Sequence, residues 1–278
     1  MFPDPIFWHI HWYGVWVAIG VLVAFVIIEQ YGKKAGVPEK TVDFVYYAIL
    51  ASIVVGFGSA ALFQAVYDFI QNPAAGFHIS GSITFLGGLI GGALCFFLAS
   101  FFYRKKLTGG YSTMLTVIPC AITAAHGFGR IGCFFAGCCY GKPTDSWLGV
   151  QFPDLPGPVH PTQLYESAFL FLLFAVLTVL FFRKKGKYNF PIYLSAYGIF
   201  RFLNEFLRGD HRGSFVGNVS PSQFWSLVMI AIGLLTAILI CKKKADPKPE
   251  EKTECESDAE AFEITEVSEE APLEGEKQ

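Results

Sequence analysis

The sequence predicts an all-α, polytopic membrane protein with about seven transmembrane helices. Of its 278 residues, 53% are hydrophobic and 17% are aromatic, and the mean hydropathy is +0.44. A run of about 20 apolar residues is long enough to cross the ~30 Å hydrocarbon core of a bilayer. Seven such runs follow one another along the chain: Trp12–Ile28, Phe44–Val66, Ile83–Tyr103, Thr113–Phe128, Leu164–Phe182, Phe190–Phe206 and Phe224–Cys241.

The first three runs have the features of ordinary membrane helices. The first opens with the aromatic residues of His11–Gly14, which are typical of a membrane interface. It lacks the basic segment and the cleavage site of a signal peptide, so no cleavable leader is expected. The third run begins with two glycine pairs, Gly87–Gly88 and Gly91–Gly92, whose small size permits close helix packing.

The last four runs are less uniform. The fourth contains Pro119 and His126, and the sixth contains Arg201 and Glu205, so these two are the weakest spans. Five prolines lie in the connection between the fourth and fifth runs, which therefore cannot be one regular helix.

The distribution of basic residues predicts the orientation. Thirteen of the 21 basic residues follow the first, third, fifth and seventh runs: Lys33, Lys34, Lys40, Arg104, Lys105, Lys106, Arg183, Lys184, Lys185, Lys187, Lys242, Lys243 and Lys244. Loops rich in Lys and Arg stay in the cytoplasm. We therefore expect the N-terminus outside and the C-terminus in the cytoplasm, and an odd number of spans.

The charge pattern also divides the chain into two parts. Residues 246–278 hold thirteen acidic and three basic residues, with Phe262 as the only aromatic residue. A segment of this composition is typically disordered. We expect a membrane domain at 1–245 and an acidic, disordered cytoplasmic tail at 246–278.

The segment from His126 to Gly141 concentrates unusual residues at the end of an apolar run, where the longest external loop is expected to begin. It contains Arg130, three cysteines and five glycines. An arginine at the edge of a bilayer is costly unless a polar or anionic group receives it, and its guanidinium matches a phosphate in a bidentate manner. Glycines at 127, 129 and 132 leave space around Arg130. The segment predicts a site for an anionic lipid headgroup; a snorkelling arginine is the alternative.

Two further polar groups have both functional and structural interpretations. Arg201 and Glu205 are four residues apart and share a helical face; a buried pair is a common structural lock, yet ionisable groups within membranes are usually functional. His160–Glu166 precedes the fifth run. It is either a helix start with Pro161 and an acidic residue near the positive end, or a polar wall for a headgroup.

The cysteines of this segment leave four interpretations open. Cys133, Cys138 and Cys139 could pack as small apolar residues, form a disulfide on the oxidising side, or present a reactive thiolate beside Arg130. Metal binding together with His126 is the fourth. The spacing matches no standard zinc pattern, and adjacent cysteines rarely bind one tetrahedral ion together, so no metal is expected.

Five segments give the chain a resemblance to the prolipoprotein diacylglyceryl transferase family. The resemblance covers most of residues 1–245, and the segments occur in the family's order: His11–Gly14, Phe85–Gly91, Gly129–Gly132, His160–Glu166 and Arg201–Glu205. It implies a multi-pass enzyme of the bacterial plasma (inner) membrane. Such an enzyme transfers the diacylglyceryl group of phosphatidylglycerol to the lipobox cysteine in the signal peptide of a prolipoprotein, and releases glycerol phosphate.

The resemblance also implies roles for individual residues. Arg130 binds the phosphate, and Arg201, held by Glu205, stabilises the headgroup or the leaving phosphate. Tyr13 lines the lipid site. The remaining substrate-binding residues expected are Gly129, Gly132, Cys133, Gly141, His160 and Gln163. The reaction requires no cofactor, and the expected partners are phosphatidylglycerol, the prolipoprotein and other membrane lipids, not nucleic acid.

The chain departs from the family pattern at several polar positions. Cys133 and Ala136 stand where asparagine is usual, Cys138 where glutamate is usual, and Leu86 where a histidine is usual; the stretch 58–60 lacks an expected arginine. His126 is the nearest candidate to replace the missing histidine. Two other functions therefore stay open: a related phospholipid-using transferase with a different acceptor, in which the cysteines take part, and a non-catalytic lipid-binding or transport protein.

Overall fold

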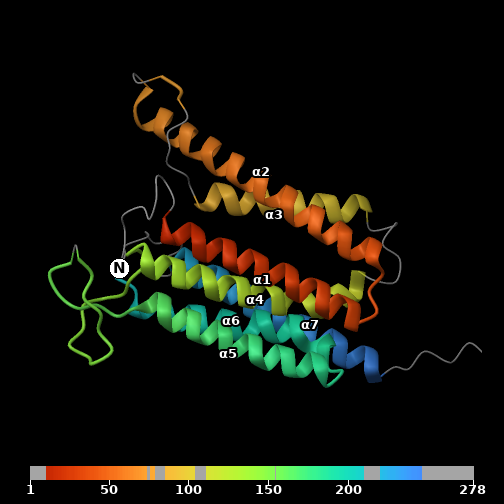
Figure 1. Cartoon of the computed structure of the whole chain (residues 1–278). Helices are drawn as coiled ribbons and strands as arrows, with labels where there is room; N and C mark the ends of the chain where they lie inside the picture. The colour runs from red at the N-terminus through yellow and green to blue at the C-terminus, as the bar shows by residue number, and fades with distance from the viewer. Residues whose placement is uncertain are drawn as a thin grey trace, which may run out of the picture. The chain divides into compact units, whose positions relative to one another are not determined.

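A computed structural model describes residues 11–73, 76–78, 85–103, 111–153, 155–209 and 220–245. Over these residues the chain forms seven α-helices and no extended strand, as the sequence predicts (Figure 1). The helices are α1 (Trp12–Lys34), α2 (Glu39–Gln71), α3 (Phe85–Tyr103), α4 (Tyr111–Phe135), α5 (Thr162–Phe182), α6 (Asn189–Asn204) and α7 (Pro221–Ala245), with short 3₁₀ turns η2 (Gly186–Tyr188) and η3 (Glu205–Leu207) around α6.

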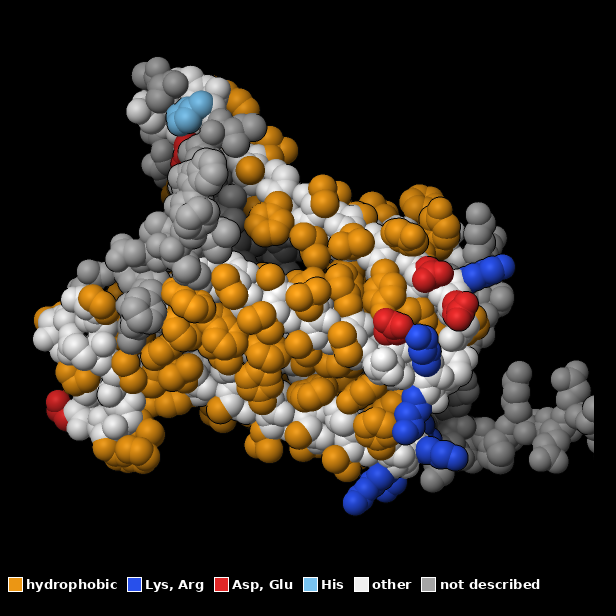
Figure 2. Space-filling view, in the orientation of Figure 1, with side chains coloured by type: hydrophobic (Ala, Val, Ile, Leu, Met, Phe, Trp, Pro, Cys, Tyr) orange, Lys and Arg blue, Asp and Glu red, His pale blue; other side chains and the backbone are white. Residues whose placement is uncertain are grey.

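Five of these helices, α1, α2, α4, α5 and α7, are long and apolar enough to cross a membrane. In α3 only Ile90–Tyr103 forms a shorter apolar stretch, and α6 has 16 residues. Apolar side chains cover much of the surface between the helix ends (Figure 2), and Leu22, Val54 and Phe102 are 63%, 73% and 72% exposed. Such a surface is suited to lipid rather than water, so the chain is a multi-pass membrane protein; seven spans and the orientation remain predictions.

The helices pack in pairs through small residues. On α3, a β-carbon at Gly88 would lie 3.3 Å from the carbonyl oxygen of Gly56 on α2, and one at Gly92 would lie 3.0 Å from that of Ser52. The packing interpretation of the third run's glycines is therefore confirmed. Helix α4 contacts α1, α5 and α6, and fully buried side chains from α2, α4 and α5 form a common apolar core: Val45, Met114, Val117, Leu170 and Leu177.

Helix α4 is longer than the sequence predicts. The expected end was Phe128, but the helix continues to Phe135 and so includes Gly129, Arg130, Gly132 and Cys133. Glycine inside a helix is unfavourable by about 1 kcal/mol relative to alanine. Here packing outweighs that cost, because Gly132 lies against α1 and Gly127 against the ring of Phe171 on α5.

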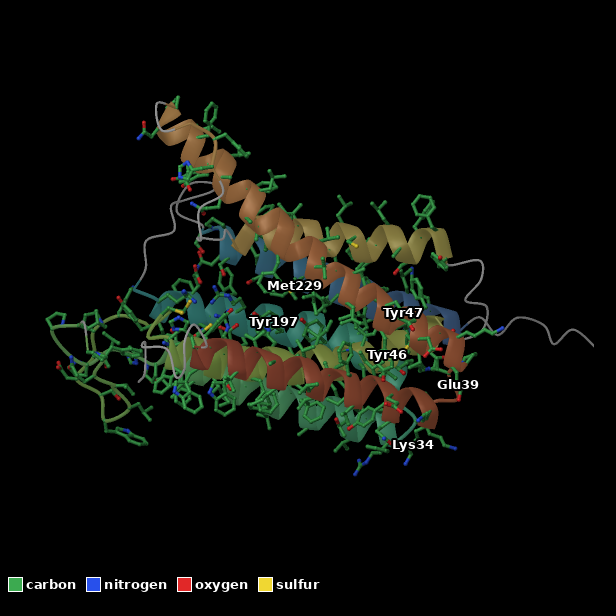
Figure 3. The ribbon with its side chains drawn as sticks, turned by 45° about the horizontal axis from the view of Figure 1, so that its top comes forward. Lys34, Glu39, Tyr46, Tyr47, Tyr197 and Met229 are labelled. Atoms are coloured by element: carbon green, nitrogen blue, oxygen red, sulfur yellow. The ribbon has the colours of Figure 1, made fainter. Side chains whose placement is uncertain are left out.

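The loops at the two ends of the helices differ in character. The α1–α2 and α5–α6 connections carry Lys33, Lys34, Lys40 and Arg183–Lys187; Figure 2 shows Lys and Arg side chains gathered at this end, where Lys34 and Glu39 are labelled in Figure 3. The α4–α5 loop lies at the opposite end in Figure 1. Backbone pairing of Gly141 with Arg208 ties this loop to the end of η3.

The C-terminal part of the chain is described only as far as residue 245. The described residues up to Ala237 form one compact unit, and Ile238–Ala245 belong to a second. The acidic segment 246–278 lies outside the described residues, so the boundary at 245 and the disorder of the tail stay predictions.

Candidate functional site

The candidate site is centred on Glu166, at the point where the end of α4, the start of α5 and the end of α6 meet. The Glu166 side chain is buried. Its Oε1 lies 3.0 Å from Nη2 of Arg130 and 3.6 Å from Nε2 of His126. The hydroxyl of Tyr197 (labelled in Figure 3) donates a hydrogen bond of 2.8 Å to the same oxygen. One carboxylate oxygen from α5 therefore gathers polar groups from α4 and α6.

The residues of α4 reach the site because of their spacing. His126, Arg130 and Cys133 are separated by four and three residues, so they lie on one face of the helix. The N-terminal part of α5 is fixed against the same helix by the Ser167 hydroxyl, which donates to the Gly127 carbonyl at 2.9 Å. Helix α5 thus presents Glu166 to the polar face of α4.

A second carboxylate, Glu205, continues the site beyond α6. Its Oε2 lies 3.0 Å from Nη2 of Arg201 and 4.0 Å from Nε of Arg208, and the hydroxyl of Ser220 donates to its Oε1 at 2.9 Å. The expected Arg201–Glu205 pair is therefore present. The charge of Arg201 also acts on Glu166, which links the two carboxylates.

These residues form a row of alternating charge, here called the charged row: Arg130, Glu166, Arg201, Glu205 and Arg208. The row carries a net charge of about +1 when all five groups are ionised. Charged groups within a membrane protein are costly to bury and are typical of functional sites. The arrangement suits a ligand with one negative charge.

Several hydrogen-bonding atoms of the charged row remain available. Nε of Arg130, Nη1 of Arg201 and Oε2 of Glu166 are buried and have no hydrogen-bond partner among the described residues. A buried donor without a partner costs free energy, and such groups call for a ligand, ion or water. The two arginine nitrogens are donors that an anion could accept.

An apolar cavity of about 420 Å³ lies between α1, α2, α3 and α4. On α4 its lining includes Ala121, Ile122 and Ala125, and Ala125 directly precedes His126 in the helix. Helix α4 therefore contributes both to the apolar cavity and to the charged row.

The glycines near Arg130 have different environments. A β-carbon at Gly132 would lie 3.2 Å from Cδ2 of Tyr13 and 3.3 Å from Cβ of Trp16, and one at Gly127 would lie 3.0 Å from the Phe171 ring. Only Gly129 of these three faces open space, with nothing within 4 Å. The expected clearance around Arg130 is thus limited to Gly129, while Gly127 and Gly132 serve helix packing. The Tyr13 side chain, 46% exposed, packs over Gly132.

Three other expected binding residues lie in the α4–α5 loop and at the start of α5. Gln163 is buried, and its Nε2 donates to the Cys138 carbonyl at 2.7 Å. Nδ1 of His160 lies 3.3 Å from the Tyr165 hydroxyl. A β-carbon at Gly141 would lie 2.5 Å from the Leu207 carbonyl oxygen. These contacts hold the loop in place, so a substrate-binding role for these residues stays a prediction.

One cysteine of the last turn of α4 and two of the loop that follows lie together next to the charged row. The Sγ atoms of Cys133, Cys138 and Cys139 are all within 4.8 Å of one another. The pKa of the Cys139 thiol is held below its usual value because the thiols of Cys133 and Cys138 hydrogen-bond to its sulfur, with a smaller effect of the neighbouring Arg208 guanidinium. The charge of Arg130 acts on Cys133 and Cys139. We call these residues the thiol cluster.

Comparison with known proteins identifies the family. Residues 5–239 match the family model described as prolipoprotein diacylglyceryl transferase. The chain belongs to this family. Over 235 residues it is 38% identical to the phosphatidylglycerol–prolipoprotein diacylglyceryl transferase of Clostridium tetani, covering 81% of this chain and 91% of the relative. It is 34% identical to transferase 2 of Clostridium perfringens (81% and 89% covered) and 29% identical to the transferase of Geobacter sulfurreducens (88% and 98% covered).

Family membership confirms the resemblance and the enzyme class that the sequence predicts. Sequence reasoning nevertheless missed the centre of the site. Glu166 was assigned only to a polar wall or a helix start, and Tyr197 was not singled out. One signal was available: Tyr197 lies four residues before Arg201, on the same face of α6. The side chain of Leu86, where the family usually has a histidine, is outside the described part of the structure.

Proposed function

We propose that the chain transfers the diacylglyceryl group of phosphatidylglycerol to a prolipoprotein, the reaction for which its relatives are named. The observation that carries this proposal is the charged row, with its net positive charge and with arginine nitrogens that no described residue partners. A phosphodiester headgroup carries one negative charge and offers oxygens that accept such donors. The apolar cavity beside α4 suits the acyl chains of the same lipid.

The reaction forms one bond and breaks another at the same carbon. The sulfur of the lipobox cysteine attacks the glyceryl carbon that carries the phosphate, and a carbon–sulfur bond forms. The carbon–oxygen bond to phosphate breaks, and glycerol phosphate leaves with the electron pair. Negative charge therefore grows on the phosphate during the reaction. Arg201 and Arg130 stabilise that charge. Preorganised donors of this kind stabilise the transition state more than the ground state, because the negative charge is larger in the transition state.

Each arginine is held for this task by its own carboxylate. Glu166 fixes Arg130 through Nη2 and leaves Nε available, while Glu205 fixes Arg201 through Nη2 and leaves Nη1 available. A guanidinium held on one edge can bind phosphate with the other without losing further conformational freedom. Arg208 contributes charge at the far end of the row.

The acceptor thiol must also lose its proton. His126 lies 3.6 Å from the Glu166 carboxylate, at the centre of the row. We assign it the role of receiving this proton, with Glu166 stabilising the imidazolium that results. Tyr13, at the start of α1, lines the lipid side of the site.

The location of the protein follows from the same proposal. The site lies at the end of the helices opposite the basic loops, and basic loops face the cytoplasm. We assign the chain to the bacterial plasma membrane as a multi-pass protein, with the site and the N-terminus on the outer side and the acidic tail in the cytoplasm.

Complementation tests the function. A strain depleted of its own transferase is supplied with this chain, and lipidation of a reporter prolipoprotein is followed by its shift in electrophoretic mobility. We expect restored lipidation with the wild-type chain and none with Arg201→Gln at equal membrane abundance. Purified protein with labelled phosphatidylglycerol and a lipobox peptide should release labelled glycerol phosphate. Correct membrane insertion without either signal would exclude this function.

A further inference from the structure

The thiol cluster combines three soft ligands in one place. Cys133 comes from the last turn of α4, and Cys138 and Cys139 come from the loop that follows. Their Sγ atoms lie within 4.8 Å of one another, and all three are free thiols. Sulfurs bound to one zinc ion, each at about 2.3 Å, lie about 4 Å apart. The cluster needs only a small contraction to reach that spacing.

The backbone of the loop is shaped to bring two neighbouring thiols to the same side. Gly137 and Cys139 have φ angles of 68° and 65°, in the left-handed region that flanks Cys138 on both sides. A residue other than glycine rarely adopts this conformation, and such residues gather at ligand sites. The turn overcomes the usual obstacle to adjacent ligands, which is that neighbouring side chains point in different directions.

Contacts from α5 hold this turn in place. The Thr162 hydroxyl donates to the Cys139 carbonyl at 2.8 Å, and Nε2 of Gln163 donates to the Cys138 carbonyl at 2.7 Å. The Cys138 thiol donates to the Cys133 carbonyl at 3.6 Å. The three thiols also contact one another, and that of Cys139 lies beside Arg208. Preorganisation of this kind is what a metal site requires of its supporting residues.

We propose that Cys133, Cys138 and Cys139 bind one zinc ion through three thiolates and leave its fourth position open. Thiolates select soft or borderline ions such as Zn²⁺ over Mg²⁺ and Ca²⁺, which require oxygen ligands. Three protein ligands with an open fourth position are typical of a zinc ion that acts on substrate. Three thiolates and Zn²⁺ together carry one negative charge, which the neighbouring Arg130 and Arg208 offset.

The open position suits the thiol of the acceptor cysteine, a role that depends on the function proposed above. A thiol that coordinates zinc loses its proton and becomes the nucleophilic thiolate. In this step the thiol proton passes to His126, the sulfur–zinc bond forms, and zinc is neither oxidised nor reduced. The sulfur then attacks the glyceryl carbon beside the charged row, as described above, and the zinc–sulfur bond is released as the thioether forms.

Metal binding by the purified full-length chain tests the site independently of activity. The reduced protein in detergent is titrated with Zn²⁺, and bound metal is measured after removal of the excess. We expect one ion per chain, with at least a tenfold loss of affinity in the triple variant Cys133→Ser, Cys138→Ser, Cys139→Ser. The matched control Cys95→Ser, Cys241→Ser should bind like the wild type. Equal binding by the triple variant, or no binding by the wild type, overturns the proposal.

Two measurements on the wild-type sequence guard against a triple variant that does not fold. Replacement of zinc by Co²⁺ should give sulfur-to-cobalt charge-transfer absorption from three thiolates. Thiol alkylation and mass spectrometry of protein purified without reductant should find all three cysteines reduced; a disulfide within the cluster in the membrane-extracted protein would overturn the site.

The open position is tested with two peptides that differ in one atom. A lipobox peptide with its cysteine should change the Co²⁺ spectrum, and the peptide with serine in its place should not. If neither peptide changes it, the role in thiol activation is wrong although the metal site stands. If the metal-free chain transfers lipid at the full rate, that role is wrong while the proposed function holds. A chain that binds zinc and the cysteine peptide but never releases glycerol phosphate would exclude the function instead.

Discussion

The α2–α3 pair and the meeting point of α4, α5 and α6 show two opposite ways of packing helices in a membrane. Between α2 and α3, glycine, alanine and serine allow the backbones to approach closely, with the Gly56 β-position 3.2 Å from the Gly88 carbonyl oxygen. Where α4, α5 and α6 meet, long ionisable side chains fill the space around Glu166. The first contact needs only small residues, whereas the second must compensate the cost of removing charges from water.

This difference predicts how the two regions respond to substitution. A packing contact made of small residues tolerates any change that keeps the backbones close, and it places no demand on charge. A buried network such as the charged row is stable only when its members are paired, so each member depends on the others. Substitutions in the two regions should therefore affect stability and activity in different proportions.

The largest effect is expected from Glu166→Ala. This change leaves Arg130 without its ion-pair partner and removes the acceptor of the Tyr197 hydrogen bond. Breaking a buried pair from one side costs about 3–5 kcal/mol, so we expect a marked fall in the melting temperature and no detectable transfer. Thermal unfolding in detergent and the glycerol phosphate assay measure the two effects.

The exposed pair Glu29–Lys33 supplies the control for this change. Its atoms are 2.7 Å apart, but the side chains are 45% and 61% exposed, and an exposed pair contributes little to stability. Glu29→Ala should therefore leave both melting temperature and activity nearly unchanged. Comparable losses in the two variants would show that the burial of Glu166 has no energetic consequence.

Arg201→Gln should lower activity strongly and lower stability less than Glu166→Ala does, because Glu205 keeps Arg208 and Ser220 as partners. The variant keeps a polar side chain near Glu205 but removes the charge that faces the leaving phosphate. Loss of one preorganised donor typically lowers kcat by about 100- to 1,000-fold, and we expect a loss in that range. Arg183→Gln, at the exposed end of α5, is the matched control and should retain full activity. A rise in KM with kcat preserved would show that Arg201 contributes to ground-state binding of the lipid instead.

Much of the fold could be predicted because it depends on local composition. Five of the seven apolar runs lie within one helix each, while the sixth continues past α6 into η3 and the third begins before the described start of α3. The glycines of α3 serve the packing that their size indicated. The end of α4 could not be predicted, since glycine and arginine are poor signals for a membrane helix on their own. Contacts with Tyr13 and Trp16 of α1 extend α4 to Phe135, and these contacts are invisible in a linear sequence.

The site was predictable only in part for the same reason. Arg130, Arg201 and Glu205 were recognised because charges in apolar segments are conspicuous. The central position of Glu166 arises from the meeting of three helix ends, and Tyr197 is an ordinary aromatic residue until its hydroxyl meets that carboxylate. The proximity of Cys133 to Cys138 and Cys139 likewise depends on left-handed backbone at Gly137 and Cys139.

The α2–α3 contact can be broken by adding one carbon. A β-carbon at Gly87 would lie 2.6 Å from Cβ of Phe63 and 3.0 Å from the Ser59 carbonyl oxygen, so Gly87→Ala forces the helices apart. Overpacking of this kind costs about 1–3 kcal/mol. Gly58→Ala, on the same pair but with nothing within 4 Å, should instead stabilise α2 by up to about 1 kcal/mol. We expect the melting temperatures to move in opposite directions while the activity per folded molecule stays the same.

The smallest effect is expected from substitution of Gly129. Comparison with Gly132 distinguishes a glycine that leaves room for the lipid from one that allows two helices to pack. Nothing lies within 4 Å of the Gly129 β-position, whereas that of Gly132 meets Tyr13 and Trp16. Gly129→Ala should leave stability unchanged or slightly raised, yet raise the KM for phosphatidylglycerol by about tenfold, the lower end for one carbon added to a binding pocket. Gly132→Ala should lower the melting temperature and raise KM less than Gly129→Ala does. If both variants changed only the melting temperature, the space beside Arg130 would not be where the lipid binds.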